Sequence, residues 1–211
     1  MIFWRMHNFS MLLTQKCLSM GLIDKSYSEW LSYSIEKRAT TLLTWFVLCL
    51  VGFFGFGWKL TLSFSIFFLL IRKYTNGYHA ATYSHCLFLS ILMEIIIFTF
   101  VSSIFYFKWA LPLILTVSSI LIWCIAPVNT ASIHWSECEL KIVKTAVRWL
   151  LFILNALAIL LIKLQIAPSI LQGLSAALAA DAITLFISSC QKLKGGRTNE
   201  NSSQGIRQKE N

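Results

Sequence analysis

The sequence is short of charge and of proline. Only 13% of its 211 residues are charged while 57% are apolar, and 16 Phe and 8 Trp stand against 3 Pro. A soluble domain carries about 25% charged and roughly 45 to 50% apolar residues, so one aqueous core cannot hide this apolar excess. The shortage of charge therefore excludes an ordinary soluble domain and predicts an all-α protein embedded in a membrane, because helices pair their own backbone groups in lipid.

Two other features are missing. The six cysteines have neither the paired spacing of a disulfide scaffold nor that of a zinc ribbon, so most are expected to be free thiols. Residues 1–10 include Arg5, His7 and Asn8, where a cleavable signal peptide needs an unbroken apolar stretch. No removable leader is therefore expected.

Apolar runs that suit a bilayer follow one another from residue 40 onward. A crossing helix needs about 20 apolar residues, with roughly 17 to 25 tolerated. The run at 61–71 is short, so it is either a thin or tilted span or a re-entrant piece. The predicted spans are 40–57, 61–71, 87–107, 110–125, 149–162 with its flank from 142, and 166–189. The expected fold is a polytopic bundle of about six transmembrane helices.

The basic residues test this map, because Lys and Arg gather in short cytosolic loops and are scarce in outer ones. With both termini inside, nearly all of the 18 Lys and Arg residues fall on the cytosolic side. The exceptions are Lys59, Lys108 and Lys163. Omitting the short span at 61–71 would move Arg72 and Lys73 outside as well. The charge pattern therefore favours six crossings and two cytosolic termini.

The two ends of the chain differ from the membrane part. Residues 1–39 mix polar and apolar side chains, and Trp30 belongs to an apolar set at helical spacing. This pattern predicts an interfacial amphipathic helix, or simply a covering helix. Residues 191–211 are too polar to bury anything and predict a disordered cytosolic tail. The membrane-embedded domain is therefore placed at 40–190.

The polar segment between the second and third predicted spans carries the most chemistry. It places a thiol, Cys86, where the chain enters the third span, with His79 seven residues earlier. A cysteine attacks a peptide carbonyl as the thiolate, a form favoured by a neighbouring imidazolium or another cation. His79 is therefore a candidate partner for Cys86, and Arg72 and Lys73 add positive potential.

The spacing of Cys86 and His79 limits how the pair can be held. Seven residues are almost two helical turns, which puts both side chains on one face but about 10.5 Å apart along the axis. A working hydrogen bond needs roughly 3 Å, so one continuous helix through both residues cannot form a dyad. Gly77 is the expected break between them.

This segment resembles the signature of the accessory gene regulator B family of bacterial membrane endopeptidases. The matching residues are Arg72, Gly77, Tyr78, His79, Ala80 and Cys86. A second similarity is the Ala-Pro-Val run at 126–128, which is followed by the charged run 136–144 as in a cytosolic loop of that family. Asn76 departs from the pattern, because many members have a second glycine there.

The resemblance implies a thiol protease in which Cys86 is the nucleophile and His79 the general base, with Arg72 and Gly77 supporting the shape of the site. Family members cut a small quorum-sensing propeptide and keep its acyl part as a thioester, which an internal Cys or Ser captures as a thiolactone or lactone. The implied partners are the propeptide and the lipid of a bacterial plasma membrane, and a homodimer is left open. No cofactor, metal or nucleic acid is expected.

A zinc site is one alternative interpretation. His134 and Cys138 stand four residues apart, which puts two metal ligands on one helical face. The same side of the membrane also holds His79, His85 and Cys86. Zinc would require the two loops to meet, and stoichiometric zinc in the purified protein would favour this reading.

A second alternative interpretation is a membrane peptide exporter without protease chemistry. Glu94 and Asp181 lie inside predicted spans, where an ionisable group by default suggests a proton or substrate path. Such groups also arise as hydrogen-bonding partners inside a bundle, and no inverted repeat accompanies them. Their roles stay open at this stage. A non-catalytic membrane adaptor is the third reading.

Overall fold

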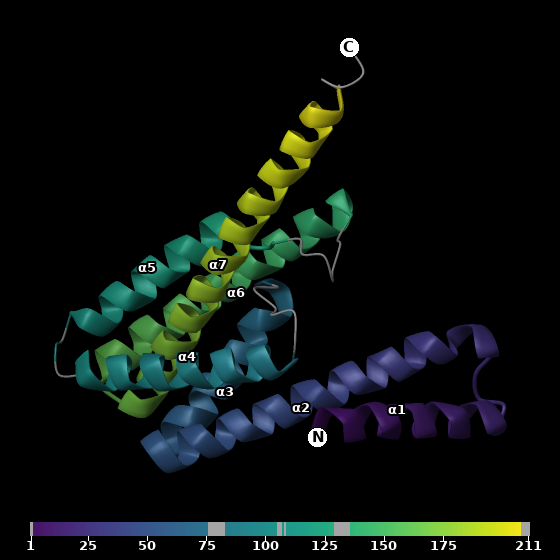
Figure 1. Cartoon of the computed structure of the whole chain (residues 1–211). Coiled ribbons are helices and arrows are strands. Elements are labelled where there is room, and N and C mark those ends of the chain that lie inside the picture. The colour runs from purple at the N-terminus through teal and green to yellow at the C-terminus, as the bar shows by residue number, and fades with distance from the viewer. Residues whose placement is uncertain (1, 76–82, 105–106, 108, 129–135, 208–211) are drawn as a thin grey trace. The chain divides into compact units, whose positions relative to one another are not determined.

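The computed structural model describes residues 2–75, 83–104, 107, 109–128 and 136–207. Over these residues the chain forms seven α-helices and one short 3-10 turn, and no strand (Figure 1). The helices are α1 (Ile2–Ser19), α2 (Ser28–Phe56), α3 (Trp58–Thr75), α4 (Tyr83–Ile104), α5 (Ala110–Ile125), α6 (Glu137–Leu164) and α7 (Pro168–Arg207). The prediction of an all-α helical bundle is confirmed.

The chain divides into two compact units, Met1–Val51 and Gly52–Asn211. In the first unit, α1 is joined to α2 through the turn at Gly21 and the 3-10 turn Lys25–Tyr27. Gly21 has a φ of 68°, a left-handed conformation that glycine adopts at no steric cost where a helix ends. The hydroxyl groups of Ser10 and Ser32 lie 3.2 Å apart and connect the two helices.

The first unit is helical, as the sequence predicts for residues 1–39, but α2 has different bounds. It runs without interruption from Ser28 to Phe56 and therefore includes both the end of the predicted interfacial segment and the first predicted span. A helix that already exists is extended at little cost, and nothing between 28 and 56 acts as a helix breaker strong enough to end it. The predicted division at 39 and 40 thus falls inside one helix.

The second unit is built around α7, which packs against α3, α4, α5 and α6 (Figure 1). Its inward face includes Leu174, Leu178 and Leu185, all fully buried. The approach of α3 is close at Gly173, where an added Cβ would overlap the Ser63 side chain. The Ser63 hydroxyl also donates a hydrogen bond to the carbonyl of Ser169 at 3.2 Å. Small residues therefore allow α3 and α7 to pack at short range.

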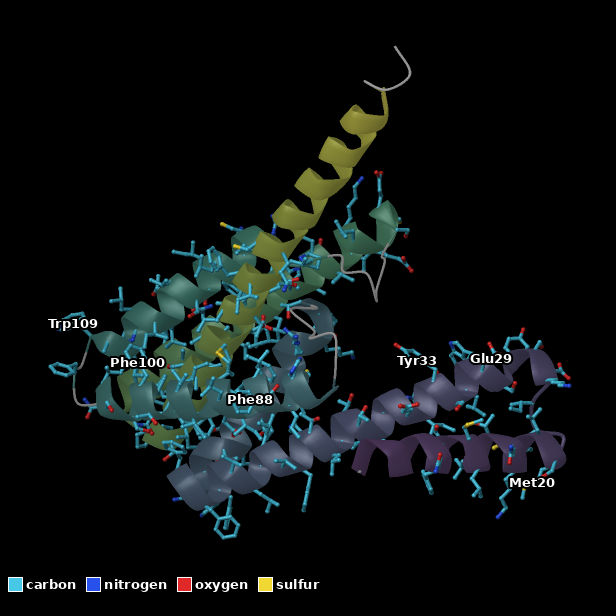
Figure 2. All side chains as sticks on the ribbon, viewed as in Figure 1. Met20, Glu29, Tyr33, Phe88, Phe100 and Trp109 are labelled. Atoms are coloured by element: carbon cyan, nitrogen blue, oxygen red, sulfur yellow. The ribbon has the colours of Figure 1, made fainter. Side chains whose placement is uncertain are left out.

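The outer surface of this unit is apolar. Phe88 and Phe100 on α4 are 66% and 56% exposed, and many other large apolar side chains are exposed with them (Figure 2). Four helices, α2, α4, α6 and α7, are long and apolar enough to cross a membrane, and α5 is a shorter apolar helix. The chain is therefore a membrane protein, for which lipid covers the apolar surface.

The sequence predicts about six crossings, whereas four of the described helices are long and apolar enough to cross a membrane and a fifth, α5, is shorter. The count of six is therefore approximate. α3 is not among the four long apolar helices, because its 18 residues include Lys59, Arg72 and Lys73. These three charges lie near the two ends of α3, and its middle is apolar.

Clear signals begin and end α6. The Ser136 hydroxyl accepts a hydrogen bond from the backbone N–H of Glu139 at 3.4 Å, and the Glu139 carboxylate accepts one from the N–H of Ser136 at 2.8 Å. This capping box satisfies backbone donors at the start of the helix. At the far end, Gln165 and Ala167 have φ values of 53° and 50°, and α7 then begins at Pro168. A tight turn therefore joins α6 to α7.

α7 extends to Arg207 and so covers most of residues 191–211. The sequence predicts a disordered tail there because those residues are polar. Once the apolar part of α7 is helical, further residues can join it without a new nucleation step, which is the costly part of helix formation. The helical bounds therefore differ from the predicted boundary at 190.

Candidate functional site

Only part of the predicted site lies within the described residues. His79 and Gly77 fall in 76–82, outside them. Cys86 is described, and it lies in the first turn of α4 with its side chain partly buried. Arg72 is described as well, in the last turn of α3. The contacts of the Cys86 and Arg72 side chains can therefore be followed, and the predicted dyad of Cys86 with His79 stays a prediction.

The Arg72 side chain reaches from α3 to α7. Its Nη1 donates a hydrogen bond to the Thr184 hydroxyl at 2.8 Å and lies 3.7 Å from Oδ1 of Asp181. The guanidinium carbon is also 6.0 Å from the centre of the Phe68 ring, on the turn of α3 before it. The Arg72 side chain is 19% exposed, so α7 and α3 together restrict where its charge can lie.

Asp181 is the buried centre of this arrangement. Its side chain is fully buried, and Oδ1 accepts a hydrogen bond from the Thr75 hydroxyl at 2.9 Å. The Thr184 hydroxyl donates to the Asp181 carbonyl at 2.9 Å, so the same threonine links Arg72 to the α7 backbone. A buried carboxylate is costly unless it is paired and hydrogen-bonded. Oδ1 of Asp181 thus has two partners on α3, Thr75 and Arg72, while Oδ2 has no hydrogen-bond partner within the described part of the chain. These contacts hold the end of α3 on α7.

Cys86 and Arg72 belong to consecutive helices. Arg72 lies in the last turn of α3, and Cys86 lies in the first turn of α4. A negative charge on Cys86 would favour the charged form of the Arg72 guanidinium. The two predicted site residues therefore lie at the ends of two helices that follow one another in the chain.

The Ala-Pro-Val run at 126–128, which also resembles the family signature, contacts the end of α3 close to Arg72. The backbone N–H of Val128 donates a hydrogen bond to the carbonyl of Thr75 at 3.3 Å. Ala126 and Val128 are 3% and 6% exposed, and the bond between Ala126 and Pro127 is cis. The chain that leaves α5 is therefore fastened to the end of α3, one turn from Arg72.

The sequence alone did not identify Thr75, Thr184 or the role of Asp181 in this site. Asp181 carried a signal, since an ionisable residue inside a span demands a partner or a function. Its partners could not be found by spacing, because Thr75 and Asp181 lie 106 positions apart in the chain. Only the packing of α3 against α7 brings them together.

Glu94 stands apart from this network. It lies on α4 and is 3% exposed, and within the described part of the chain neither of its carboxylate oxygens has a hydrogen-bond partner. Its neighbours include Gly52 and Thr61: a Cβ added at Gly52 would lie 2.8 Å from Oε1 of Glu94 and 2.6 Å from Oγ1 of Thr61. Gly52 therefore leaves the room that the Glu94 side chain occupies.

The alternative zinc site is not tested. Among the residues that the structure describes, no three His, Cys, Asp or Glu side chains form a group able to hold a metal ion. His79 and His134 lie outside those residues, while Cys138 is exposed on the first turn of α6 and His85 is exposed on α4. The zinc reading therefore stays an alternative.

Comparison with known proteins adds one finding. The family model described as accessory gene regulator B matches residues 9–187, a region that contains Arg72, Cys86, Asp181 and the run at 126–128. A search of curated proteins and a search of solved structures each gave no match.

Proposed function

Since this chain belongs to the accessory gene regulator B family, whose role is the processing of quorum-sensing peptides, we propose that it is a membrane cysteine endopeptidase. Its substrate is a small propeptide, cut at the cytosolic face of a bacterial plasma membrane. The observation that supports this proposal best is the position of Cys86 in the first turn of α4, which follows the end of α3 that carries Arg72. The nucleophilic form of a cysteine is the thiolate, which helix N-termini and nearby cations favour in general.

The reaction uses Cys86 and His79. The Cys86 sulfur attacks the carbonyl carbon of the scissile peptide bond, and His79 accepts the thiol proton. The carbon–nitrogen bond then breaks, and the same proton passes from His79 to the leaving amine. The acyl part remains on Cys86 as a thioester. An internal Cys or Ser of the peptide attacks that thioester, which closes a thiolactone or lactone ring and releases the Cys86 thiol.

Arg72 is proposed to supply the cationic field, with Asp181 as a positioning residue that acts through Arg72. Two contacts from α7 support this role, the ion pair with Asp181 and the hydrogen bond to Thr184. A guanidinium tied at two points loses less conformational freedom when a thiolate forms beside it. Gly77 is proposed to shape the segment that carries His79.

The topology we propose has six crossings, α2 to α7, with both termini cytosolic. The end of α3 and the end of α5 meet at Thr75 and Val128, which supports this topology because alternating crossings place these two helix ends on the same side of the membrane. The basic residues Arg72 and Lys73 then lie on the cytosolic side, in agreement with the orientation rule.

The test is co-expression of the chain with small peptides encoded beside its gene. We expect peptide cleavage with the native chain and its loss in Cys86→Ala and in His79→Ala. Cys124→Ala is the matched control, because Cys124 is an exposed cysteine on α5 and should be dispensable. Cleavage that persists in both active-site variants would remove the peptidase proposal.

A further inference from the structure

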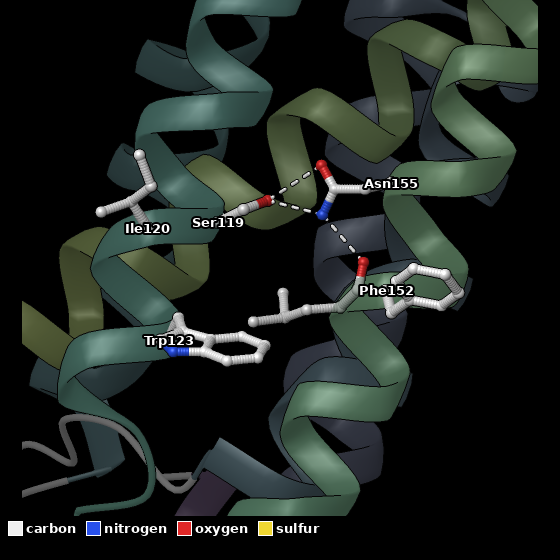
Figure 3. Close-up of a pocket in the computed structure, with 6 residues that line it drawn as sticks. Ser119, Ile120, Trp123, Phe152 and Asn155 are labelled. Carbon is white, nitrogen blue, oxygen red and sulfur yellow. Dashed lines mark hydrogen bonds between the residues drawn. The ribbon is translucent and has the colours of Figure 1, made fainter.

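A groove with a volume of about 410 Å³ lies between α5 and α6 (Figure 3). Its lining residues are Ser119, Ile120 and Trp123 from α5, and Leu151, Phe152 and Asn155 from α6. Ile120 and Phe152 are 57% and 66% exposed, so the groove opens on the outer, apolar surface of the membrane unit. In a bilayer this surface is covered by lipid.

The polar atoms in the groove already have partners. The Asn155 amide nitrogen donates to the Ser119 hydroxyl at 2.9 Å and to the Leu151 carbonyl at 2.8 Å (Figure 3). The Ser119 hydroxyl lies 3.3 Å from the Asn155 amide oxygen. Because these two side chains satisfy each other, the surface offered to an occupant is mainly that of Ile120, Trp123, Leu151 and Phe152. An apolar chain suits that surface.

One end of the groove is cationic. The Arg148 guanidinium carbon lies 4.8 Å from the centre of the Trp123 ring, so α5 and α6 hold a positive charge beside the groove. Lys144 and Lys141 precede Arg148 by four and seven residues on α6, and both are exposed. Residues at such spacings share a helix face, and Leu151 and Asn155 continue the same face into the groove. A row of three basic residues therefore leads to the apolar lining.

The cationic end is also the membrane boundary that we assign to the cytosol. Trp123 lies near the end of α5, just before the run at 126–128 that is fastened to Thr75. Trp prefers the interface between hydrocarbon and water, because its apolar ring can lie in the hydrocarbon while its N–H forms hydrogen bonds with water or headgroups. A headgroup at that level would lie beside Arg148.

We propose that this groove is a binding site for an anionic phospholipid. One acyl chain lies between Ile120 and Phe152, and the phosphate pairs with Arg148 and Lys144. Basic pockets between transmembrane helices at the cytosolic face are suited to anionic headgroups. A zwitterionic lipid would also fill the apolar groove, but the cation of its own headgroup would be repelled by Arg148 and Lys144 and would weaken the pairing of its phosphate. An acidic peptide would pair with the cations but has no chemistry that calls for an outward-facing apolar groove.

The experiment uses the full chain, reconstituted in vesicles of equal parts phosphatidylglycerol and phosphatidylcholine and then released for native mass spectrometry. We expect the native chain to retain phosphatidylglycerol in preference to phosphatidylcholine. The double substitution Arg148→Gln with Lys144→Gln should reduce the retained phosphatidylglycerol by roughly 25-fold, since each of the two surface cations strengthens the attraction to anionic lipid by about fivefold. Filling the groove with Ile120→Trp should reduce it with all charges present.

Two matched controls separate a site from general attraction. Arg148→Lys keeps the charge and should retain the lipid, and Lys163→Gln removes a cation from the opposite end of α6 and should change nothing. Equal retention of both lipids, or equal loss in Lys163→Gln, would mean unspecific lipid and overturn the proposal. A third result would also overturn the proposal: the double variant retains as much phosphatidylglycerol as the native chain but binds an acidic peptide more weakly. The basic residues would then bind a peptide and not a lipid. None of these readouts depends on peptide cleavage.

Discussion

The Nη1 atom of Arg72 lies 3.7 Å from Oδ1 of Asp181, which connects the last turn of α3 to the middle of the central helix α7. The Thr75 hydroxyl donates a hydrogen bond to Oδ1 of Asp181. The Thr184 hydroxyl accepts one from Arg72 and donates one to the backbone carbonyl of Asp181. Arg72 also lies at the end of α3, and the next helix along the chain, α4, carries Cys86 in its first turn. The chemistry proposed for Cys86 thus depends on how α3 is held against α7.

Removing the Arg72 charge should slow chemical modification of Cys86. In Arg72→Gln, the reaction of Cys86 with iodoacetamide at neutral pH should be slower than in the native chain, because nearby cations in general make a thiol more reactive. Arg72→Lys keeps a positive charge and should be affected less. Site-resolved mass spectrometry of the alkylated peptides gives the rate, and the exposed Cys124 serves as an internal reference. An unchanged rate at Cys86 would argue against an electrostatic role for Arg72.

Breaking the buried pair should lower stability. Asp181→Asn leaves Arg72 without its counterion and should cost about 3 kcal/mol of unfolding free energy, and Arg72→Gln leaves Asp181 without its own and is measured beside it. The double variant Arg72→Gln with Asp181→Asn removes both charges and should recover part of that loss. Thermal unfolding of the detergent-solubilised chain measures both effects. If the two single losses simply add in the double variant, Arg72 and Asp181 are not coupled.

Gly52 and Gly55 offer a matched comparison on one helix. A Cβ at Gly52 would lie 2.6 Å from the Thr61 hydroxyl oxygen, whereas nothing lies within 4 Å of one at Gly55. Gly52→Ala should therefore destabilise the chain by about 1 to 3 kcal/mol through overpacking. Gly55→Ala should be neutral or slightly stabilising, because alanine favours a helix. Equal thermal shifts in the two variants would contradict the close packing at Gly52.

Glu94 separates the peptidase from the exporter. It lies eight residues after Cys86 on α4, about 12 Å along the helix axis, so it is too distant for the reacting bonds. We expect Glu94→Gln to change cleavage by no more than about twofold, which is within the usual effect of a distant neutral substitution. Product inside and outside the cells is measured separately. Intact cleavage with loss of the external product would favour a transport path through Glu94.

The membrane class of the fold could be predicted because it depends on composition, and the shortage of charged residues is a property of the whole chain. Arg72 and Cys86 are predicted as site residues because they lie in one short segment with a recognisable spacing, and their role in catalysis stays a prediction. The length of α2 could not be predicted, because a helix beginning at Ser28 passes smoothly from polar to apolar sequence. The partners of Asp181 could not be predicted from the sequence either, since they depend on which face of α7 packs against α3.

The fastening of Val128 to Thr75 has a consequence for how members of this family could come to differ. Val128 precedes residues 129–135 and is tied to α3, and Ser136 follows them and caps α6. The first contact joins the backbone of Val128 to that of Thr75, and the second joins Ser136 to Glu139 of α6 itself. Homologues can therefore differ in sequence between positions 128 and 136 while these two contacts keep the same atoms.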